Sequence, residues 1–416
     1  MEQLYVSYRQ QIVGVISQTA SGLMDFRYAG GWSASSAAFP ISLSLPLNGK
    51  FSVEAGHHFF ANLLPEGNVR EQICRSLKIS TNNDFELLKA IGGDCAGALA
   101  VTASDALDST LSLPRFESVS DEQLALWSVG TPDAFSAVTG QNEVRLSLAG
   151  AQDKLPVCVA SGQILIPMGS TPSTHILKFA SPYYSHLPEN ETFLTLLASE
   201  VGLPVVDISL RKTANAPVAL ITRYDRRFSE GHFIRMHQED FCQALGISSS
   251  RKYEKEGGPS IKQCVEIVRR HTAYPLVDLQ KLLHWMLFNL IVGNADAHGK
   301  NLSLLYDSTG WPRLAPFYDL VCTRNYKKIS REMAMNYGGV WDPDLVSAKH
   351  IEGLAMDFGF RSSLVMEQVN SLVDKVSNGL PVAVDKYAQR FGDSPIIECV
   401  PIVIRKLIRR LRAQLK

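Results

Sequence analysis

Two polar residues in the second half of the chain, Asp296 and Asn301, have the types and the spacing that phosphoryl transfer needs. A carboxylate at Asp296 could accept or orient the proton of an attacking hydroxyl group. The amide of Asn301 could offer a neutral oxygen to Mg²⁺ without adding negative charge beside the phosphates. Lys300 could place a positive charge near the transferred phosphoryl group. Residues 294–301 are therefore our candidate catalytic loop, with Asp296 as base and Lys300 as a second catalytic residue.

A further acid follows this loop where a second metal ligand would be needed. Asp319 comes after a short predicted strand and a turn. An Asp and an Asn five residues apart, followed by another Asp, is the order found in protein kinases, where the last Asp chelates Mg²⁺. Leu320 stands where those enzymes have Phe, and no Gly follows, which argues against a protein-kinase activation flip but not against metal binding. The alternative is that Asp296 and Asp319 are two solvated loop acids.

The residues that would hold ATP lie mostly upstream. Residues 147–154 are rich in small side chains, which let backbone N–H groups approach phosphate oxygens, although a plain β-turn is the alternative. Lys178 lies in an apolar segment, where a lysine needs partners such as ATP phosphates and the carboxylate of Glu191; an edge-strand lysine reaching solvent is the alternative. Residues 222–224 would form the hinge near adenine. The predicted nucleotide-binding residues are Ala149, Gly150, Ala151, Gln152, Asp153, Lys154, Lys178, Thr222, Arg223, Tyr224, His298, Gly299, Asn301, Tyr318 and Asp319.

The elements that must position these residues divide the chain into three predicted parts. Residues 1–114 combine alternating strand patterns with a Gly-rich turn and helical segments, among them one near 59–64 and one that Asn83 would cap. This mixture is typical of a small α+β subdomain. Residues 115–228 are dominated by strand signals and contain a helix at 191–201, and residues 229–416 are mostly helical. A strand-rich lobe followed by a helical lobe predicts a bilobal α+β layout.

Composition narrows the class of protein. The 41 basic and 41 acidic residues cancel, which argues against a protein that binds nucleic acid over its whole surface. The seven cysteines are scattered without a Cys-x-x-Cys pair, so we expect buried thiols and neither disulfides nor a zinc site. The longest apolar stretch, 282–292, is too short to span a membrane, and we expect it to form a buried helix. The N-terminus lacks the pattern of a secretion signal. We expect a cytoplasmic protein.

The last residues of the sequence form a predicted amphipathic helix. Its apolar residues fall on one face, and its basic residues lie elsewhere. The apolar set is Ile404, Leu407, Ile408, Leu411 and Leu415, and the basic set is Arg405, Lys406, Arg409, Arg410 and Arg412. A solvated basic face is the simpler interpretation, and contact with DNA inside a larger complex is the alternative.

The sequence resembles the HipA family of bacterial toxin kinases over nearly its whole length. The matching stretches are 62–67, 92–99, 147–154, 175–179, 238–246, 252–254, 257–259, the loop around Asp296, and 316–319. The resemblance implies a bilobal protein-kinase-like fold with an extra N-terminal subdomain. It implies a serine/threonine protein kinase that uses ATP and Mg²⁺. It also implies a HipB-type helix-turn-helix antitoxin as partner, with operator DNA bound through the antitoxin. An aminoacyl-tRNA synthetase, the glutamyl enzyme above all, is the implied substrate, and its phosphorylation arrests growth. Ser147 matches the serine that the family autophosphorylates, after which its loop leaves the site.

Two other functions compete with this one. A small-molecule kinase could use the same fold, because Asp296, Asn301 and Asp319 do not distinguish a protein hydroxyl from a small alcohol or amine. A catalytically idle co-repressor module is the second alternative. The presence of Lys178 together with the three catalytic-loop and metal residues argues against it, since such a module needs none of them.

Overall fold

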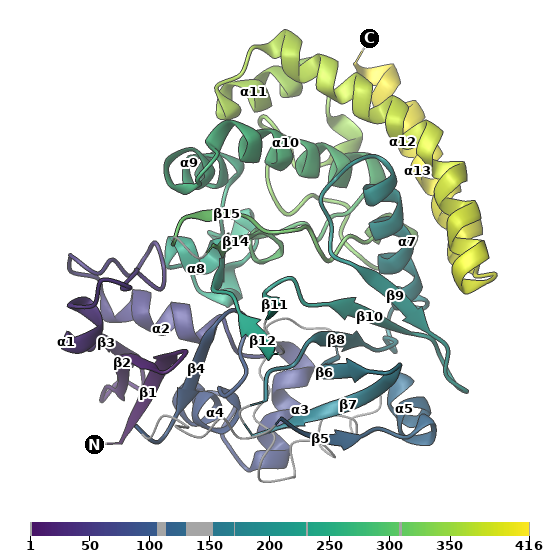
Figure 1. The fold of residues 1–416 in the computed structure, drawn as a ribbon. Helices are drawn as coiled ribbons and strands as arrows, with labels where there is room; N and C mark the ends of the chain where they lie inside the picture. Colours follow the sequence, from purple (N-terminus) through teal and green to yellow (C-terminus); the bar gives the residue numbers. More distant parts are fainter. Residues whose placement is uncertain are drawn as a thin grey trace. The chain divides into compact units, whose positions relative to one another are not determined.

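The computed structural model describes residues 2–105, 114–129, 153–169, 171–229, 232–307 and 310–415. The chain forms two compact units that are each discontinuous in sequence. The first unit comprises residues 1–182, 211–250 and 305–310, and the second comprises 183–210, 251–304 and 311–416. The first contains most of the strands and the second contains the longest helices (Figure 1). The three-part division at 114 and 228 stays a prediction.

An antiparallel four-stranded sheet opens the first unit, in the order β3-β2-β1-β4. The strands are β1 (Gln3–Tyr8), β2 (Gln11–Gln18), β3 (Met24–Tyr28) and β4 (Leu99–Thr102), and the helices are α1 (Gly30–Ser33), α2 (Val53–Ala61), α3 (Gly67–Leu77) and α4 (Asp84–Ile91). The predicted cap of α4 is confirmed, because the Asn83 side chain accepts a hydrogen bond from the Glu86 N–H. The helix expected near residue 59 begins earlier, at Val53, because Ser52 caps it.

A second sheet carries the predicted nucleotide-binding strands. Within the first unit its order is β5-β7-β6-β8-β10. These strands are β5 (Arg115–Ser118), β6 (Lys154–Ala160), β7 (Gln163–Met168), β8 (His175–Lys178) and β10 (Val218–Thr222), and β9 (Ile208–Arg211) spans the unit boundary. Helix α5 (Asp121–Ser128) packs Leu124 and Trp127 onto the apolar face that includes Leu155 and Leu177. The sheet therefore buries one face and holds Lys178 at the end of β8.

The first unit ends in short elements around a buried acid. They are β11 (Arg226–Ser229), β12 (His232–Arg235), β13 (Gln238–Asp240) and α8 (Phe241–Leu245). The fully buried Glu239 accepts hydrogen bonds from Ser42 Oγ at 2.6 Å, from the Leu43 N–H at 3.2 Å, and from the Tyr306 hydroxyl. Burial raises the pKa of Glu239 to about 7, more than these three donors lower it.

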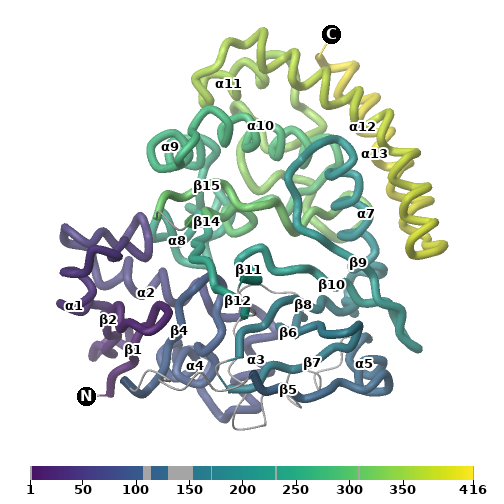
Figure 2. The backbone as a smooth tube through the Cα atoms, viewed as in Figure 1, coloured from purple at the N-terminus to yellow at the C-terminus, as the bar shows by residue number. Residues whose placement is uncertain are grey.

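The second unit is built from helices, as the sequence predicted for the end of the chain. They are α7 (Leu187–Glu200), α9 (Ile261–His271), α10 (Pro275–Val292), α11 (Ala348–Phe358), α12 (Ser362–Phe391) and α13 (Pro395–Gln414). Two short strands accompany them, β14 (Ser303–Tyr306) and β15 (Pro312–Leu314), and the last residues of β14 belong to the first unit. Helices α12 and α13 turn at Gly392 and run side by side (Figure 2). The predicted apolar face of α13 is confirmed, since Ile404, Leu407, Ile408 and Leu411 are buried.

Helix α10 is the central helix of this unit. It contacts α9, α12 and α13, and most of its residues are buried. This confirms the expectation that residues 282–292 form a buried helix. In the part of the chain that the structure describes, no helix is long and apolar enough to cross a membrane.

Candidate active site

The predicted catalytic loop begins where α10 ends. Gly293 ends the helix in a left-handed conformation (φ 72°), and a Cβ atom there would lie 2.5 Å from Arg324 Cγ. A short 3-10 turn, η3 (Gly299–Asn301), closes the loop. Lys300 and Asn301 are buried, whereas the side chain of Asp296 is 52% exposed. An accessible carboxylate beside buried polar groups suits a base that must meet a substrate from solution.

One buried amide, Asn294, ties this loop to the segment of Asp319. Its Oδ1 accepts the Asp296 N–H at 3.2 Å, and its Nδ2 donates to the Asp319 carbonyl at 3.3 Å. The same Nδ2 donates to Asn289 Oδ1 on α10 at 2.9 Å. Thr323 makes a second tie, because its Oγ1 accepts the Ala295 N–H at 2.8 Å. The structure therefore holds together, within one unit, the two acids that the sequence placed in one site.

The backbone around Asp319 is unusual. Asp319 has φ 54°, in the left-handed region that most side chains avoid. The hydroxyl of the preceding Tyr318 donates to the Lys300 carbonyl at 2.7 Å and lies 2.7 Å from Ser303 Oγ. Tyr318 thus braces the catalytic loop through its hydroxyl group.

The oxygen atoms of this site fit a nucleotide-bound cation. Asn301 Nδ2 donates to the Asp296 carbonyl at 2.8 Å, which fixes the amide and turns its oxygen toward other partners. Among the residues that the structure describes, no group of three His, Cys, Asp or Glu side chains could hold a metal alone. Mg²⁺ held with ATP needs fewer protein ligands, because phosphates and water complete its shell. Asn301 and Asp319 are the residues that would hold it.

Two lysines of the first unit face each other on the neighbouring strands β6 and β8. Lys154 and Lys178 are direct partners in the antiparallel register, so their side chains leave the same face of the sheet. Lys178 is only 4% exposed. Burial raises the pKa of Asp153, the residue before Lys154. Like charges placed opposite one another cost free energy unless anions lie close to both. Ser147 and residues 149–152, predicted to cover the phosphates, lie outside the described residues.

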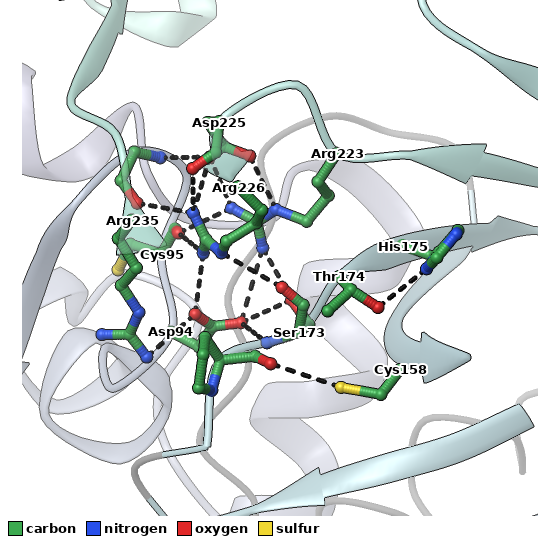
Figure 3. A network of polar contacts seen from close by, with 12 residues as sticks. Asp94, Cys95, Cys158, Ser173, Thr174, His175, Arg223, Asp225, Arg226 and Arg235 are labelled. Carbon is green, nitrogen blue, oxygen red and sulfur yellow. Dashed lines mark hydrogen bonds and ion pairs between the residues drawn. The ribbon is translucent and has the colours of Figure 1, made fainter. Parts of the chain in front are cut away.

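The predicted hinge is anchored by a buried ionic network (Figure 3). Arg223 donates to both carboxylate oxygens of Asp225, at 2.9 and 2.7 Å, and to Ser173 Oγ at 2.8 Å. Arg226 donates to Asp94 Oδ1 at 2.8 Å. Since the Arg223 side chain is committed here, a contact from residue 223 to a nucleotide would have to come from its backbone. Thr222 ends β10, and the Tyr224 hydroxyl donates to Gln238.

Asp94 is the centre of this network. Burial raises the pKa of its carboxyl group, but Arg226, Arg235 and Arg223 outweigh burial and hold the pKa well below its usual range. No function was predicted for Asp94 from the sequence. A pattern in the sequence nevertheless pointed to a buried acid: charged residues within 223–226 directly follow the apolar strand β10, and buried charges need partners of opposite charge.

Tyr253 is a second residue of the site that was not predicted from the sequence. Its hydroxyl donates a hydrogen bond of 2.5 Å to Asp296 Oδ1. Its ring meets the ring of His298 edge to face, with the ring centres 5.3 Å apart. His298 Nε2 is 3.9 Å from Asp296 Oδ1, so this histidine shapes the surroundings of the base. Tyr253 lies 43 residues from Asp296 in sequence, and no local pattern connects the two.

Comparisons with known proteins agree with this architecture. Residues 4–102 match the HipA N-terminal domain, and residues 146–381 match the HipA-like C-terminal domain. A "Putative kinase Y4mE" of Sinorhizobium fredii is 38% identical over 397 residues, 94% of each chain. The "Serine/threonine-protein kinase toxin HipA" of Shewanella oneidensis is 31% identical over 365 residues, 85% of this chain and 82% of that one.

A solved structure matches as well. It is that of the Shewanella oneidensis toxin–antitoxin system HipA and HipB with its operator DNA, and it matches with a TM-score of 0.83 at 25% identity, covering 99% of this chain and 97% of that chain. This match confirms the predicted α+β, kinase-like fold. The names of the relatives support kinase activity for the family as a whole. The chain therefore belongs to the HipA family of toxin kinases, as its motifs predicted.

Proposed function

We propose that this chain is an ATP- and Mg²⁺-dependent serine/threonine protein kinase and the toxin of a toxin–antitoxin pair. The observation that carries the proposal is the double tie made by Asn294, which joins the Asp296 loop to Asp319. A pair of solvated loop acids would not need a buried amide to hold them together. The half-exposed Asp296 would take the proton of the substrate hydroxyl, and Lys300 would place its charge beside the phosphoryl group.

The remaining predicted residues have complementary roles. Asn301 and Asp319 would hold the cation. Lys154 and Lys178 would hold the phosphates, because their side chains leave the same face of the sheet. Asp153, Thr222, Tyr224, the backbone of Arg223 and residues 149–152 would line the nucleotide site, and His298, Gly299 and Tyr318 would shape its catalytic side. ATP would supply the phosphoryl group, and Mg²⁺ would neutralise charge on it.

Calorimetry with ATP tests the metal assignment. Wild-type protein should bind ATP more tightly with Mg²⁺ than without it. Asp319→Asn should lose most of this difference, because the substitution removes a charged ligand and suits the left-handed backbone. Asp385→Asn, an exposed change on α12, is the matched control and should behave as wild type. An unchanged Mg²⁺ dependence in Asp319→Asn would overturn the assignment of this residue.

Substrate class and toxicity need tests in cells and extracts. Labelled ATP added to a lysate with the protein should mark protein bands; label confined to small molecules would favour the small-molecule kinase. Expression without the antitoxin should arrest growth, and Asp296→Gln should relieve the arrest. Phosphoproteomics should then show a serine of an aminoacyl-tRNA synthetase, by family membership the glutamyl enzyme. A dominant site on an unrelated protein would overturn that substrate and leave the kinase intact.

Partner and self-modification follow from the same family membership. We propose a HipB-type antitoxin as the partner, with operator DNA reached through it, because the matching solved structure is such a complex. We also propose autophosphorylation at Ser147. Phosphoserine adds about −1.5 to −2 charges at neutral pH, which would repel ATP from the loop at 147–154. Mass spectrometry after incubation with ATP should find phosphate on Ser147 in wild type and none in Asp296→Gln.

A further inference from the structure

Residues 251–259 form a tightly folded segment of the second unit, called here the Tyr253 loop. The Gly258 N–H donates to the Tyr253 carbonyl at 2.9 Å. A Cβ atom on Gly258 would lie 2.3 Å from the Arg251 carbonyl oxygen, so only glycine allows this close approach. Gly257 has φ 90°, again a conformation that suits glycine. The two glycines therefore fold the chain back and fix the backbone that carries Tyr253.

The Tyr253 loop is anchored to residues 332–341 of the same unit. The Glu254 N–H donates to the Ala334 carbonyl at 3.0 Å, and Glu254 Oε2 accepts the Asn336 N–H at 2.6 Å. Lys255 forms an ion pair with Glu332 at 2.5 Å. These anchors on the residues directly after Tyr253 fix the backbone from which its side chain reaches Asp296.

The Tyr253 loop touches the catalytic loop at two points. The Tyr253 hydroxyl donates to Asp296 Oδ1 at 2.5 Å. Farther along, Pro259 packs on Gly299 so closely that a Cβ atom on Gly299 would lie 2.4 Å from the proline Cγ. The second contact holds the two loops in register, and the first places a hydroxyl group on the proposed base. Tyr253 is half-buried and Asp296 half-exposed, so both atoms of the contact can be reached from solution.

A hydroxyl that donates a hydrogen bond to the base is what a protein substrate must also present there. We propose that Tyr253 gates the acceptor site: its hydroxyl occupies, on Asp296 Oδ1, the place that the substrate hydroxyl must take, and keeps water off this oxygen until the substrate displaces it. The inference rests on the proposed kinase function. Such a gate would keep the base from activating water for ATP hydrolysis before a substrate arrives.

The reaction that the gate would control is transfer of the γ-phosphoryl group of ATP to a hydroxyl group or to water. The oxygen of the acceptor O–H forms a bond to the γ-phosphorus, the bond from that phosphorus to the β,γ-bridging oxygen breaks, and ADP leaves. The acceptor proton passes to the Asp296 carboxylate. With water as acceptor the products are ADP, inorganic phosphate and a proton. Tyr253→Phe removes one oxygen atom and leaves room for a water molecule in its place on Asp296, with the ring still packed on His298.

Phosphate release from ATP and Mg²⁺, without any protein acceptor, is the first test. Tyr253→Phe should raise the rate about tenfold over wild type, the factor expected for one hydrogen bond to a charged group. Its affinity for ATP in calorimetry should stay unchanged, because Tyr253 contacts the base. The double variant Tyr253→Phe/Asp296→Asn should lose the increase. Tyr274→Phe, on an exposed tyrosine at the start of α10, is the matched control and should release phosphate at the wild-type rate.

Nuclear magnetic resonance gives a readout that does not depend on activity. In protein labelled with ¹³C at tyrosine Cζ, the signal missing from Tyr253→Phe identifies Tyr253. That signal should shift in Asp296→Asn, because the hydroxyl then loses its charged acceptor. If the chemical shift of the Tyr253 signal is the same in Asp296→Asn as in wild type, the contact between Tyr253 and Asp296 is refuted. Phosphate release equal to or below wild type in Tyr253→Phe, with ATP affinity unchanged, would overturn the gate. If wild type and all variants fail to turn over ATP, the proposed function itself fails, and the gate fails with it.

Discussion

Replacing Asp94 with asparagine should destabilise the first unit by about 3–5 kcal/mol, the usual cost of removing one partner from a buried ion pair. Three arginines surround Asp94 and Asp225, so the substitution leaves three guanidinium groups with a single carboxylate. The Arg235 side chain is 19% exposed and can turn toward solvent. The Arg226 side chain is 1% exposed and cannot. Most of the loss should therefore come from Arg226, whose remaining carboxylate partner, Asp225 at 3.0 Å, is shared with Arg223.

Hydrogen exchange near Gly97 reports this loss directly. The buried Gly97 N–H donates to Asp225 Oδ2 at 2.7 Å, so its exchange requires the network to open. A loss of about 3–5 kcal/mol predicts exchange faster by roughly two to three and a half orders of magnitude. Asp25→Asn is the matched control, because the Asp25–Arg27 pair lies on the surface, where such pairs contribute about 0–1 kcal/mol.

Acid provides a second measurement of the same carboxylate. The folded-state pKa of Asp94 is depressed, so its contribution to stability is present above its unfolded pKa and is lost as the pH falls toward the folded pKa. The wild type should lose stability in acid more steeply than Asp94→Asn. If Asp94→Asn changes exchange at Gly97 no more than Asp25→Asn does, the network adds nothing to stability and the reasoning is refuted.

Three other predictions test separate features. Because burial raises the pKa of Glu239 to about 7 from its usual 4.5, the protein should lose stability as the pH rises through this range. Glu239→Gln should therefore flatten the profile of melting temperature against pH, and an unchanged profile would contradict the shift in pKa. Asn294→Ala should lower the turnover of ATP by at least tenfold while the affinity for ATP changes little, because both ties to the catalytic loop and Asp319 are lost; equal turnover would contradict the role of the amide. A water-soluble thiol reagent should label only Cys399 in the native protein, because the other six cysteines are buried, and all seven in denaturant; early labelling of a second thiol would contradict this.

The parts of the site that sequence could predict are those whose evidence is local. The spacing of Asp296 and Asn301, the buried helix before them, and the cap at Asn83 each depend on residues a few positions apart. The family motifs extended the prediction from these patterns to the fold. The register that sets Lys154 opposite Lys178 was not predictable, because it depends on how β6 pairs with β8.

The contacts that the sequence could not predict join distant residues. Arg226 and Asp94 are 132 positions apart, and Tyr253 and Asp296 are 43 apart. A charged residue after an apolar strand indicates that it has a partner of opposite charge, but it does not indicate which residue that partner is. A tyrosine in a Gly-rich turn does not even indicate a polar partner, because its ring could equally pack in a hydrophobic core. Such pairs become visible only when the backbone brings the two segments together.

The left-handed backbone at Asp319 has a consequence for genetic selection against the proposed toxic activity. Single-base changes of an aspartate codon give Asn, Gly, His, Tyr, Ala, Val or Glu. Asn and Gly tolerate a positive φ, whereas the branched side chain of Val is the most strained there. Among colonies that survive expression of the toxin, those with Asn or Gly at this position should still contain abundant full-length protein able to bind the antitoxin. Survivors with Val should contain little, because the protein they make misfolds and is degraded.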